Sequence, residues 1–414
     1  MKIVVVGNGV AGEAACFAVR SRRKDVKITL ISKDSYPFYS PCILPQYISK
    51  EIKKSQIFLK SLADYEREGI DILFGQEVKS VDASKKLLSL DGQEIAYDKL
   101  ILATGSLPII LDIEGIQKRG VRVFKSLRDA DRLLRAQGVK AIVVGSGPIG
   151  VELAVALRKR NWEVCLVEAL DWILPSRFDE KGSQKLRSVL EKQGIEIVTG
   201  EKVLAIEGKR KVKGVVTSKT GEREADMVVL SVGMRPSVEL ARGAGVEVGA
   251  LGGIRTNGKM ETNVKDIYAC GDCIEGRDSL TGSPKLSLLW PHAERQGRVA
   301  GCNSIDVESF VRWVPDIVNL DAFGTFAGAI GQPQSLLERG NKIEVLEEER
   351  RGYYHCLVIA EGRLVGAQFI GDSESMGVLQ PFMGRGYDEI CRQIEDDGST
   401  ARFPWYFFAR NFFH

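Results

Sequence analysis

Two segments of this chain share one design, and that repeat constrains the fold more than any other feature of the sequence. The segments KIVVVGNGVAGEAACFAVR and KAIVVGSGPIGVELAVALR each run from a short β-branched stretch through spaced glycines into an alanine-rich stretch. Each leads to a second strand-like stretch, so the order is strand, glycine turn, helix and strand. A dinucleotide-binding βαβ unit has this order. The sequence therefore predicts an α/β fold that contains two Rossmann-like units.

The spaced glycines indicate what each unit binds. Glycine allows a tight turn and close approach of the backbone to a pyrophosphate, and the next helix offers unpaired amides and the positive end of its dipole. The alternative, that the glycines only form strand-to-helix turns, fits either copy alone but fits two copies poorly. We therefore expect an anionic cofactor at each copy. The predicted contacts are Gly7, Asn8, Gly9, Val10, Ala11 and Gly12 in the first copy, and Gly145, Gly147, Pro148, Ile149 and Gly150 in the second.

The end of the second strand in each unit predicts which cofactor is preferred. In the second copy, WEVCLVEAL places Glu168 where a carboxylate accepts hydrogen bonds from a ribose diol and repels a 2′-phosphate. NADH is therefore favoured over NADPH. In the first copy, VKITLISKD places Ser32 and Lys33 where an acidic residue is usual, although a hydroxyl can still bind a ribose.

Length and charge exclude several classes of protein. A chain of 414 residues is long enough for two or three domains, and a net charge of +3 predicts no nucleic-acid partner. The longest apolar-looking stretch, residues 141–157, contains glycines, a proline and Glu152, so we expect no membrane span. The N-terminus lacks a signal-peptide cleavage site, and the eight cysteines lack the spacing of a secreted disulfide scaffold. A cytoplasmic location is expected.

Four further motifs follow in order: KLILATGSLP, DMVVLSVGMRP, NVKDIYACGDC and AERQGRVAG. With the two glycine units, they make the chain resemble the pyridine nucleotide-disulfide oxidoreductase superfamily over nearly its whole length. The resemblance implies FAD at the first unit and NADH at the second. It implies that Asp272 binds the ribityl chain of FAD, that the helix around Ala293 points at the flavin, and that Glu152 orients the nicotinamide carboxamide. Further implied cofactor contacts are Val78, Ala103, Thr104, Gly105, Arg128, Gly233 and Gly271.

The same resemblance predicts the domain boundaries. A discontinuous FAD-binding domain takes residues 1–112 and 243–312, and an NAD-binding domain takes residues 113–242. Residues 313–414 contain the strand-like LVIAEGRLVGAQFIGD and resemble the α+β interface domain of the family, which usually forms a homodimer.

Cys42 is the candidate catalytic residue. It follows the second strand of the first unit, where related enzymes place a helix that faces the flavin. Single-cysteine NADH oxidases and coenzyme A disulfide reductases resemble the chain here, whereas enzymes with a CxxxxC pair have a second cysteine at the position of Tyr47. A thiolate stabilised by a helix dipole would attack a disulfide or polysulfide. The alternative is that Cys42 is a small apolar residue packed against the flavin.

Several residues depart from the resembling enzymes. NADH peroxidase carries a histidine where this chain has Val10, and coenzyme A disulfide reductases follow their cysteine with glycine, whereas Ile43 follows here. The Cys270–Cys273 pair flanks Asp272 and is interpreted as packing, with a redox or metal role as the second interpretation. The three histidines indicate no metal site, and His292 is expected just before the flavin-facing helix. The aromatic tail FPWYFFARNFF must be buried, either in the homodimer or against a different subunit.

Two functions remain open. The first is an FAD-dependent NADH oxidoreductase that reduces a disulfide, sulfur or oxygen acceptor through Cys42. The second is a flavin electron-transfer subunit that resembles rubredoxin or ferredoxin reductases and exchanges electrons between NAD(H) and an iron–sulfur protein.

Overall fold

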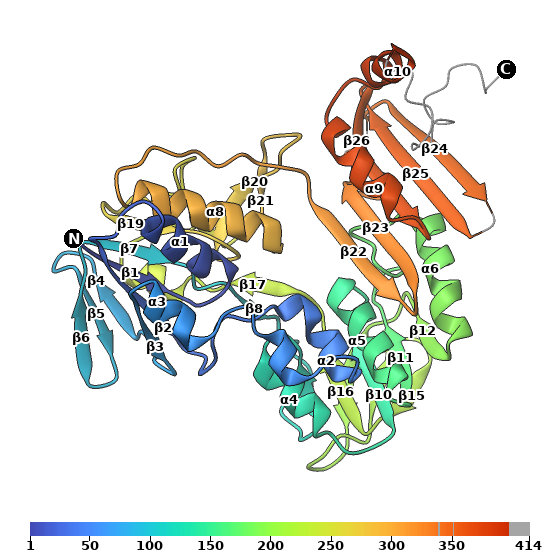
Figure 1. Ribbon diagram of the computed structural model, residues 1–414. Helices are drawn as coiled ribbons and strands as arrows, with labels where there is room; N and C mark the ends of the chain where they lie inside the picture. Colours follow the sequence, from blue (N-terminus) through green and yellow to red (C-terminus); the bar gives the residue numbers. More distant parts are fainter. Residues whose placement is uncertain (338–339, 351, 397–414) are drawn as a thin grey trace. The chain divides into compact units, whose positions relative to one another are not determined.

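The computed structural model describes residues 1–337, 340–350 and 352–396 (Figure 1). Its internal contacts divide the chain into two units. The first unit comprises residues 1–43, 52–107 and 234–314, and the second comprises residues 44–51, 108–233 and 315–414. The predicted boundaries at residues 112, 242 and 312 stay predictions. The aromatic tail lies outside the described residues.

A five-stranded parallel sheet forms the centre of the first unit. Its order is β19 (Ile267–Ala269), β7 (Lys99–Leu102), β1 (Lys2–Val6), β2 (Lys27–Ser32) and β3 (Ile70–Phe74). The central strand β1 reads KIVVV and is buried beyond its first residue, as expected for a parallel strand covered on both faces. Helix α1 (Val10–Arg20) follows β1 directly and packs along α8 (Trp290–Asn303) (Figure 1).

A second sheet with the same arrangement lies in the second unit. Its order is β12 (Ile195–Val198), β11 (Glu163–Val167), β10 (Lys140–Val144), β16 (Met227–Leu230) and β9 (Val121–Val123). Helix α5 (Pro148–Lys159) follows the central strand β10, as α1 follows β1. The fold class predicted from the glycine repeat is confirmed.

The repeat extends further than the glycine segments alone indicated. In each unit an antiparallel three-stranded sheet precedes the strand that returns beside the central one. These sheets are β4 (Ser80–Asp82), β5 (Leu87–Leu90) and β6 (Gln93–Ala96) in the first unit, and β13 (Val203–Glu207), β14 (Gly214–Thr217) and β15 (Gly221–Glu224) in the second. The copies differ between their second and third parallel strands, where the first holds the Cys42 segment.

A third five-stranded sheet, antiparallel, occupies the C-terminal part of the second unit. Its order is β22 (Ile317–Ala322), β23 (Thr325–Gly331), β26 (Arg363–Ile370), β25 (Tyr353–Ala360) and β24 (Ile343–Arg350). Helix α9 (Glu374–Leu379) packs on β23 and β26, and α6 (Glu180–Lys192) contacts β22, β25 and β26 (Figure 1). The strand prediction for LVIAEGRLVGAQFIGD is confirmed by β25 and β26.

The remaining elements are short. In the first unit they are the 3₁₀ turns Pro41–Ile43 and Lys54–Ile57, α3 (Leu62–Arg67), β17 (Met234–Pro236), α7 (Glu239–Gly243), β18 (Ile254–Arg255), β20 (Ile274–Arg277) and β21 (Pro284–Lys285). Strand β8 (Ser106–Pro108) spans the boundary between the two units. In the second they are α2 (Leu44–Ile48), α4 (Leu127–Leu134), the 3₁₀ turns Gln334–Leu336 and Gln380–Phe382, and α10 (Tyr387–Asp396). Within the described residues, no helix has the length and apolar character that a bilayer span requires.

Candidate functional site

The three glycines of the first loop have three different surroundings. Gly7 has a φ of +114°, and a Cβ on it would lie 2.1 Å from the carbonyl oxygen of Ala103. A Cβ on Gly12 would lie 1.9 Å from the carbonyl oxygen of Gly7. A Cβ on Gly9, in contrast, would meet no atom within 4 Å. Gly7 and Gly12 are therefore required by packing, whereas Gly9 leaves the approach to the helix open.

The second loop repeats these surroundings position by position. Gly145 has a φ of +97° and would place a Cβ 2.4 Å from the carbonyl oxygen of Ser231. A Cβ on Gly150 would lie 2.0 Å from the carbonyl oxygen of Gly145, and one on Gly147 would meet nothing within 4 Å. The two loops are thus one local structure built twice.

Both helix N-termini suit a pyrophosphate. Gly9 caps α1 and Gly147 caps α5, and neither cap has a side chain that accepts a hydrogen bond from the first turn. Pro148 occupies the first turn of α5, where its missing N–H costs nothing. Uncapped first-turn amides beside an open glycine form an anion site. The residues present therefore fit a dinucleotide at each loop.

Ser32, at the end of β2, and Glu168, directly after β11, make different hydrogen bonds. The Glu168 carboxylate is buried and accepts hydrogen bonds from Ser146 N (2.8 Å), Ser146 Oγ (2.6 Å) and Leu170 N (3.0 Å). It is thereby fixed against the second glycine loop, where a ribose diol is expected. At the equivalent position, Ser32 donates to the carbonyl oxygen of Asp34 at 2.9 Å. Lys33 is exposed and forms an ion pair with Glu77 at 2.6 Å.

A glutamate lies on each glycine-loop helix, and only Glu152 was predicted. Glu13 is buried, and Glu152 is half-buried. Burial raises the pKa of Glu152 on α5 to about 7, and nearby Asp321 adds to the increase. Burial also raises the pKa of Glu13 on α1 to about 7, against the lowering effects of Tyr65 and Lys60. Acids with pKa values raised in this way are enriched at functional sites and also occur at purely structural positions. Glu13 immediately follows Gly12, and a carboxylate at that point of an apolar helix face was the available signal.

Hydrogen bonds connect residues in and next to three of the sequence motifs, KLILATGSLP, DMVVLSVGMRP and NVKDIYACGDC. Thr104 Oγ1 donates to the carbonyl oxygen of Ser237 at 2.6 Å, and the Ser237 amide donates to Gly105 at 2.9 Å. Strands β8 and β17 accordingly pair as a two-stranded sheet. Ser106 Oγ donates to Asp272 Oδ2 at 2.8 Å, which holds this carboxylate beside the loop that leaves β7.

Small residues bring α8 against α1. A Cβ on Gly297 would lie 2.1 Å from the carbonyl oxygen of Ala11, and one on Gly301 would lie 2.5 Å from that of Ala15. The Gly271 amide donates to Gln296 Oε1 at 2.8 Å, which attaches α8 to the loop of Asp272. The predicted helix exists but begins at Trp290, so the expectation that His292 precedes it is wrong. Pro291 at the start of the helix suits its first turn.

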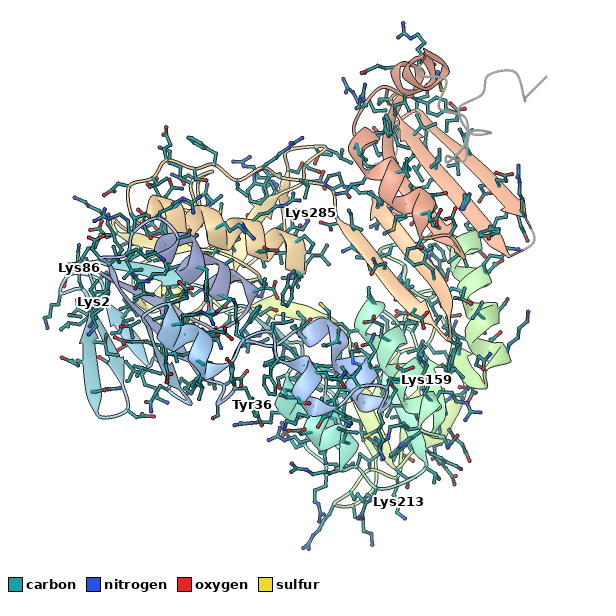
Figure 2. All side chains as sticks on the ribbon, in the orientation of Figure 1. Lys2, Tyr36, Lys86, Lys159, Lys213 and Lys285 are labelled. Atoms are coloured by element: carbon teal, nitrogen blue, oxygen red, sulfur yellow. The ribbon has the colours of Figure 1, made fainter. Side chains whose placement is uncertain are left out.

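Cys42 lies in the 3₁₀ turn Pro41–Ile43 and is exposed, whereas the other described cysteines are buried. The helix that follows it, α2, has five residues, so it offers a smaller dipole than a longer helix would. Although flanked by residues of the first unit, α2 packs on α4 and α5 of the second. Tyr47 donates to Asp131 Oδ1 at 2.9 Å. Lys159, which is labelled in Figure 2, pairs with Glu51 at 2.7 Å.

The Cys270–Cys273 pair shows the surroundings of packed thiols. Both are buried, and burial raises the pKa of each. Cys273 Sγ donates to the carbonyl oxygens of Cys270 (3.2 Å) and Leu102 (3.5 Å). Among the described residues, no group of three or more histidine, cysteine or acidic side chains is arranged for a metal ion.

The other predicted contacts occupy varied positions. Ala293 is buried in the first turn of α8, Val78 is half-buried after β3, and Arg128 is exposed on α4. Gly233 has a φ of +107° between β16 and β17.

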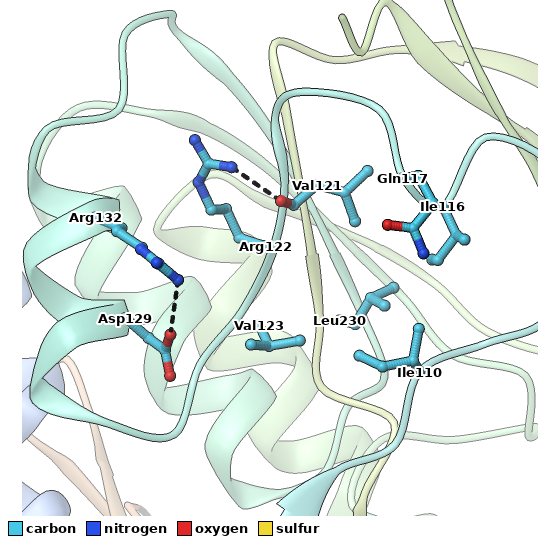
Figure 3. A pocket seen from close by; sticks show the side chains of 9 residues that line it. All are labelled: Ile110, Ile116, Gln117, Val121, Arg122, Val123, Asp129, Arg132 and Leu230. Carbon is cyan, nitrogen blue, oxygen red and sulfur yellow. Dashed lines mark hydrogen bonds and ion pairs between the residues drawn. The ribbon is translucent and has the colours of Figure 1, made fainter. Parts of the chain in front are cut away.

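A pocket of about 360 Å³ lies beside the edge strand β9, and Figure 3 shows its lining. Arg122 donates to the carbonyl oxygen of Val121 there, and Arg132 lies 3.9 Å from Asp129. None of the predicted cofactor residues lines it. The residues that do are Ile110, Ile116, Gln117, Val121, Arg122, Val123, Asp129, Arg132 and Leu230.

Comparison with known proteins gives one family and several relatives. Residues 1–297 match the model of the pyridine nucleotide-disulphide oxidoreductase family. An NADH oxidase of Methanocaldococcus jannaschii is 38% identical over 75% of this chain and 71% of its own length. The epsilon subunit of the NADH-dependent phenylglyoxylate dehydrogenase of Aromatoleum evansii is 27% identical over 94% of this chain and 92% of its own.

Among solved structures, an NAD-dependent persulfide reductase of A. fulgidus superposes with a TM-score of 0.89 at 27% identity. The match covers 95% of this chain and 79% of that one. The chain spans about half the length of two longer curated relatives, 51% and 48%.

Proposed function

Because the chain belongs to the pyridine nucleotide-disulphide oxidoreductase family and is an FAD-dependent NADH oxidoreductase, we propose that it reduces a disulfide, sulfur or oxygen acceptor through Cys42. With a disulfide, the reaction balances as NADH, one proton and the disulfide giving NAD⁺ and two thiols. The observation that carries this proposal is an exposed thiol on a chain with two matching glycine loops. The persulfide reductase with the same fold supports a sulfur acceptor.

Each glycine loop takes one role in this proposal. Gly145, Gly147 and Gly150 receive the pyrophosphate of NADH, and Glu168 accepts hydrogen bonds from its ribose. Glu152 orients the nicotinamide carboxamide. The first loop, together with Asp272 and the N-terminus of α8, holds FAD. FAD supplies the two-electron chemistry when it is bound, and the chain supplies binding and orientation.

An anaerobic titration with NADH tests the role of Cys42. Full-length protein with bound FAD is titrated while the flavin spectrum and the electrons taken up per FAD are followed, in wild type and in Cys42→Ser. We expect a long-wavelength thiolate–flavin charge-transfer band in wild type that is absent in the variant. Turnover with a disulfide acceptor should fall at least about a hundredfold in the variant, whereas dye reduction is retained. Equal disulfide turnover in both proteins would contradict a catalytic thiol.

A second function is favoured by a different observation. The epsilon subunit of phenylglyoxylate dehydrogenase matches this chain over nearly the full length of both. This supports a flavin electron-transfer subunit that exchanges electrons between NAD(H) and an iron–sulfur partner. In that case Cys42→Ser keeps full reduction of a one-electron acceptor such as ferredoxin, and wild type shows no disulfide turnover.

Three further parts of the proposal concern organisation. We infer that residues 1–112 and 243–312 bind FAD, that residues 113–242 bind NADH, and that residues 313–414 form a homodimer interface. A cytoplasmic location is consistent with seven buried cysteines that form no disulfide. Sedimentation of the full-length holoprotein tests the homodimer, and a monomer at micromolar concentration would contradict it.

A further inference from the structure

The first glycine loop contains a buried acid that the proposed function does not use. Glu13 follows Gly12 in the first turn of α1, and its side chain is 5% exposed. Its Oε1 atom is buried and has no hydrogen-bond partner among the described residues. Its Oε2 atom lies 3.2 Å from the hydroxyl of Tyr65. A buried carboxylate with one unsatisfied oxygen is costly if it is ionised.

The hydrogen-bond network around Tyr65 holds two acceptors for one hydroxyl hydrogen unless Glu13 is neutral. The Tyr65 hydroxyl accepts from the Phe38 amide at 3.3 Å and lies 3.2 Å from both Asn8 Oδ1 and Glu13 Oε2. Asn8 Nδ2 donates to the carbonyl oxygen of Tyr36 at 3.3 Å, which orients Asn8 Oδ1 as an acceptor. One hydroxyl hydrogen cannot serve two acceptors. If Glu13 is protonated, it donates to Tyr65, and Tyr65 then donates to Asn8.

The charged groups around Glu13 do not compensate an ionised carboxylate. Burial is the largest influence and raises its pKa to about 7; the hydrogen bond of Tyr65 and the charge of Lys60 lower it, and Asp64 raises it. On the same helix, burial and Glu13 raise the pKa of Cys16, so that thiol stays neutral. From α8, it is glycines rather than charged side chains that meet α1 at Ala11 and Ala15.

We propose that FAD binding at the first glycine loop is coupled to the uptake of one proton by Glu13. Asn8 belongs to the loop, and the uncapped amides of Val10, Ala11 and Gly12 begin the same helical turn. A pyrophosphate placed there brings negative charge close to Glu13 and disfavours its ionised form further. Apoprotein with ionised Glu13, one proton and FAD therefore give a complex in which Glu13 is neutral. The inference goes beyond the proposed acceptor chemistry and depends only on FAD binding.

The test measures FAD affinity as a function of pH. Full-length apoprotein is titrated with FAD between about pH 6 and about pH 8.5, and quenching of FAD fluorescence gives Kd. We expect Kd to rise by up to about tenfold per pH unit above neutrality in wild type, as a one-proton linkage requires. In Glu13→Gln, which keeps a neutral side chain of the same shape, Kd should be independent of pH and match the wild-type value at low pH.

Calorimetry supplies a second readout that does not depend on a variant. FAD binding measured near pH 8 in buffers with different ionisation heats should show uptake of about one proton per FAD in wild type. Tyr65→Phe is the matched control, because it keeps Glu13 and removes only the hydroxyl. It should retain proton uptake, but over a higher pH range, because the hydrogen bond of Tyr65 lowers the pKa of Glu13. A pH-independent Kd in wild type, or equal pH dependence in Glu13→Gln, would overturn the proposal whatever the acceptor proves to be.

Discussion

The two glycine loops have the same backbone conformation, but different helices and side chains surround them. In both, the first and third glycines are required by carbonyl oxygens within 2.4 Å of an added Cβ, and the middle glycine is open. The first loop is closed by α8, whose glycines contact α1, and its strand ends in a serine. In the second, Glu168 directly follows the end of strand β11 and is held by Ser146, and helix α5 contacts α2. The comparison teaches that the repeat builds the same glycine turn twice, whereas the residues that surround the turn differ between the copies.

Filling the third glycine should break each loop separately and have the largest effect. In Gly12→Ala or Gly150→Ala the new methyl group overlaps a backbone carbonyl that cannot move freely, so we expect a loss of about 3 kcal/mol in stability at that loop. Gly12→Ala should be purified without FAD, and Gly150→Ala should be purified with FAD but without reduction by NADH.

Flavin absorbance after purification and after addition of NADH measures both outcomes. Gly245→Ala, at a surface position with φ of +77° and open space, controls for glycine replacement in general. Loss of FAD from both loop variants alike would show that the loops are not independent.

Glu13 and Glu152 allow the two glycine-loop helices to be compared through the pH dependence of the free energy of unfolding. An unfolded glutamate loses its proton near pH 4.5, whereas Glu13 and Glu152 keep theirs to about pH 7 in the folded chain. The free energy of unfolding should therefore fall as pH rises between these values, by on the order of 3 kcal/mol for each group, and level off above. Urea unfolding at about pH 5 and about pH 8 should show a smaller fall in Glu13→Gln and in Glu152→Gln than in wild type. Identical falls in all three proteins would contradict raised pKa values.

Substituting the residues at the ends of β11 and β2 should test the proposal that NADH binds at the second loop. Glu168→Gln removes the charge that accepts from Ser146 and Leu170, so the KM for NADH should rise about tenfold, and discrimination against NADPH should weaken. Ser32→Ala is the matched change in the first loop, and it should leave the KM for NADH and the discrimination against NADPH unchanged. Steady-state dye reduction with each coenzyme measures the difference.

The smallest expected effect concerns the segment that distinguishes the copies. Tyr47→Phe removes the hydrogen bond to Asp131, which should cost about 1 kcal/mol of stability. If α2 positions Cys42, the rate of Cys42 alkylation should rise several-fold in this variant, while Tyr353→Phe, at an exposed position, leaves it unchanged. An unaltered alkylation rate in Tyr47→Phe would separate α2 from the reactivity of Cys42.

The two glycine loops and their strands could be predicted from the sequence, because glycine spacing and strand patterns depend on residues that are close together in the chain. Gly7, Gly12, Gly145 and Gly150 could be named in advance, since a tight turn and a close helix–strand approach each require glycine. The arrangement of α2 could not be predicted, because the hydrogen bond of Tyr47 to Asp131, and the ion pair of Lys159 with Glu51 just after the helix, join residues far apart in the chain. The network of Glu13, Tyr65 and Asn8 was missed for the same reason, as Tyr65 comes from a separate helix.

The order of strands in the first sheet has a consequence for synthesis on the ribosome. Its edge strand β19 lies at Ile267–Ala269 and its covering helix α8 ends at Asn303, whereas the sheet of the second glycine loop is complete at Leu230. The first sheet, although its glycine loop is translated first, can therefore be completed only after the whole second sheet has been translated. A nascent chain released after about residue 235 should hold a complete second parallel sheet and an unfinished first sheet, in which β7 still lacks its neighbour β19.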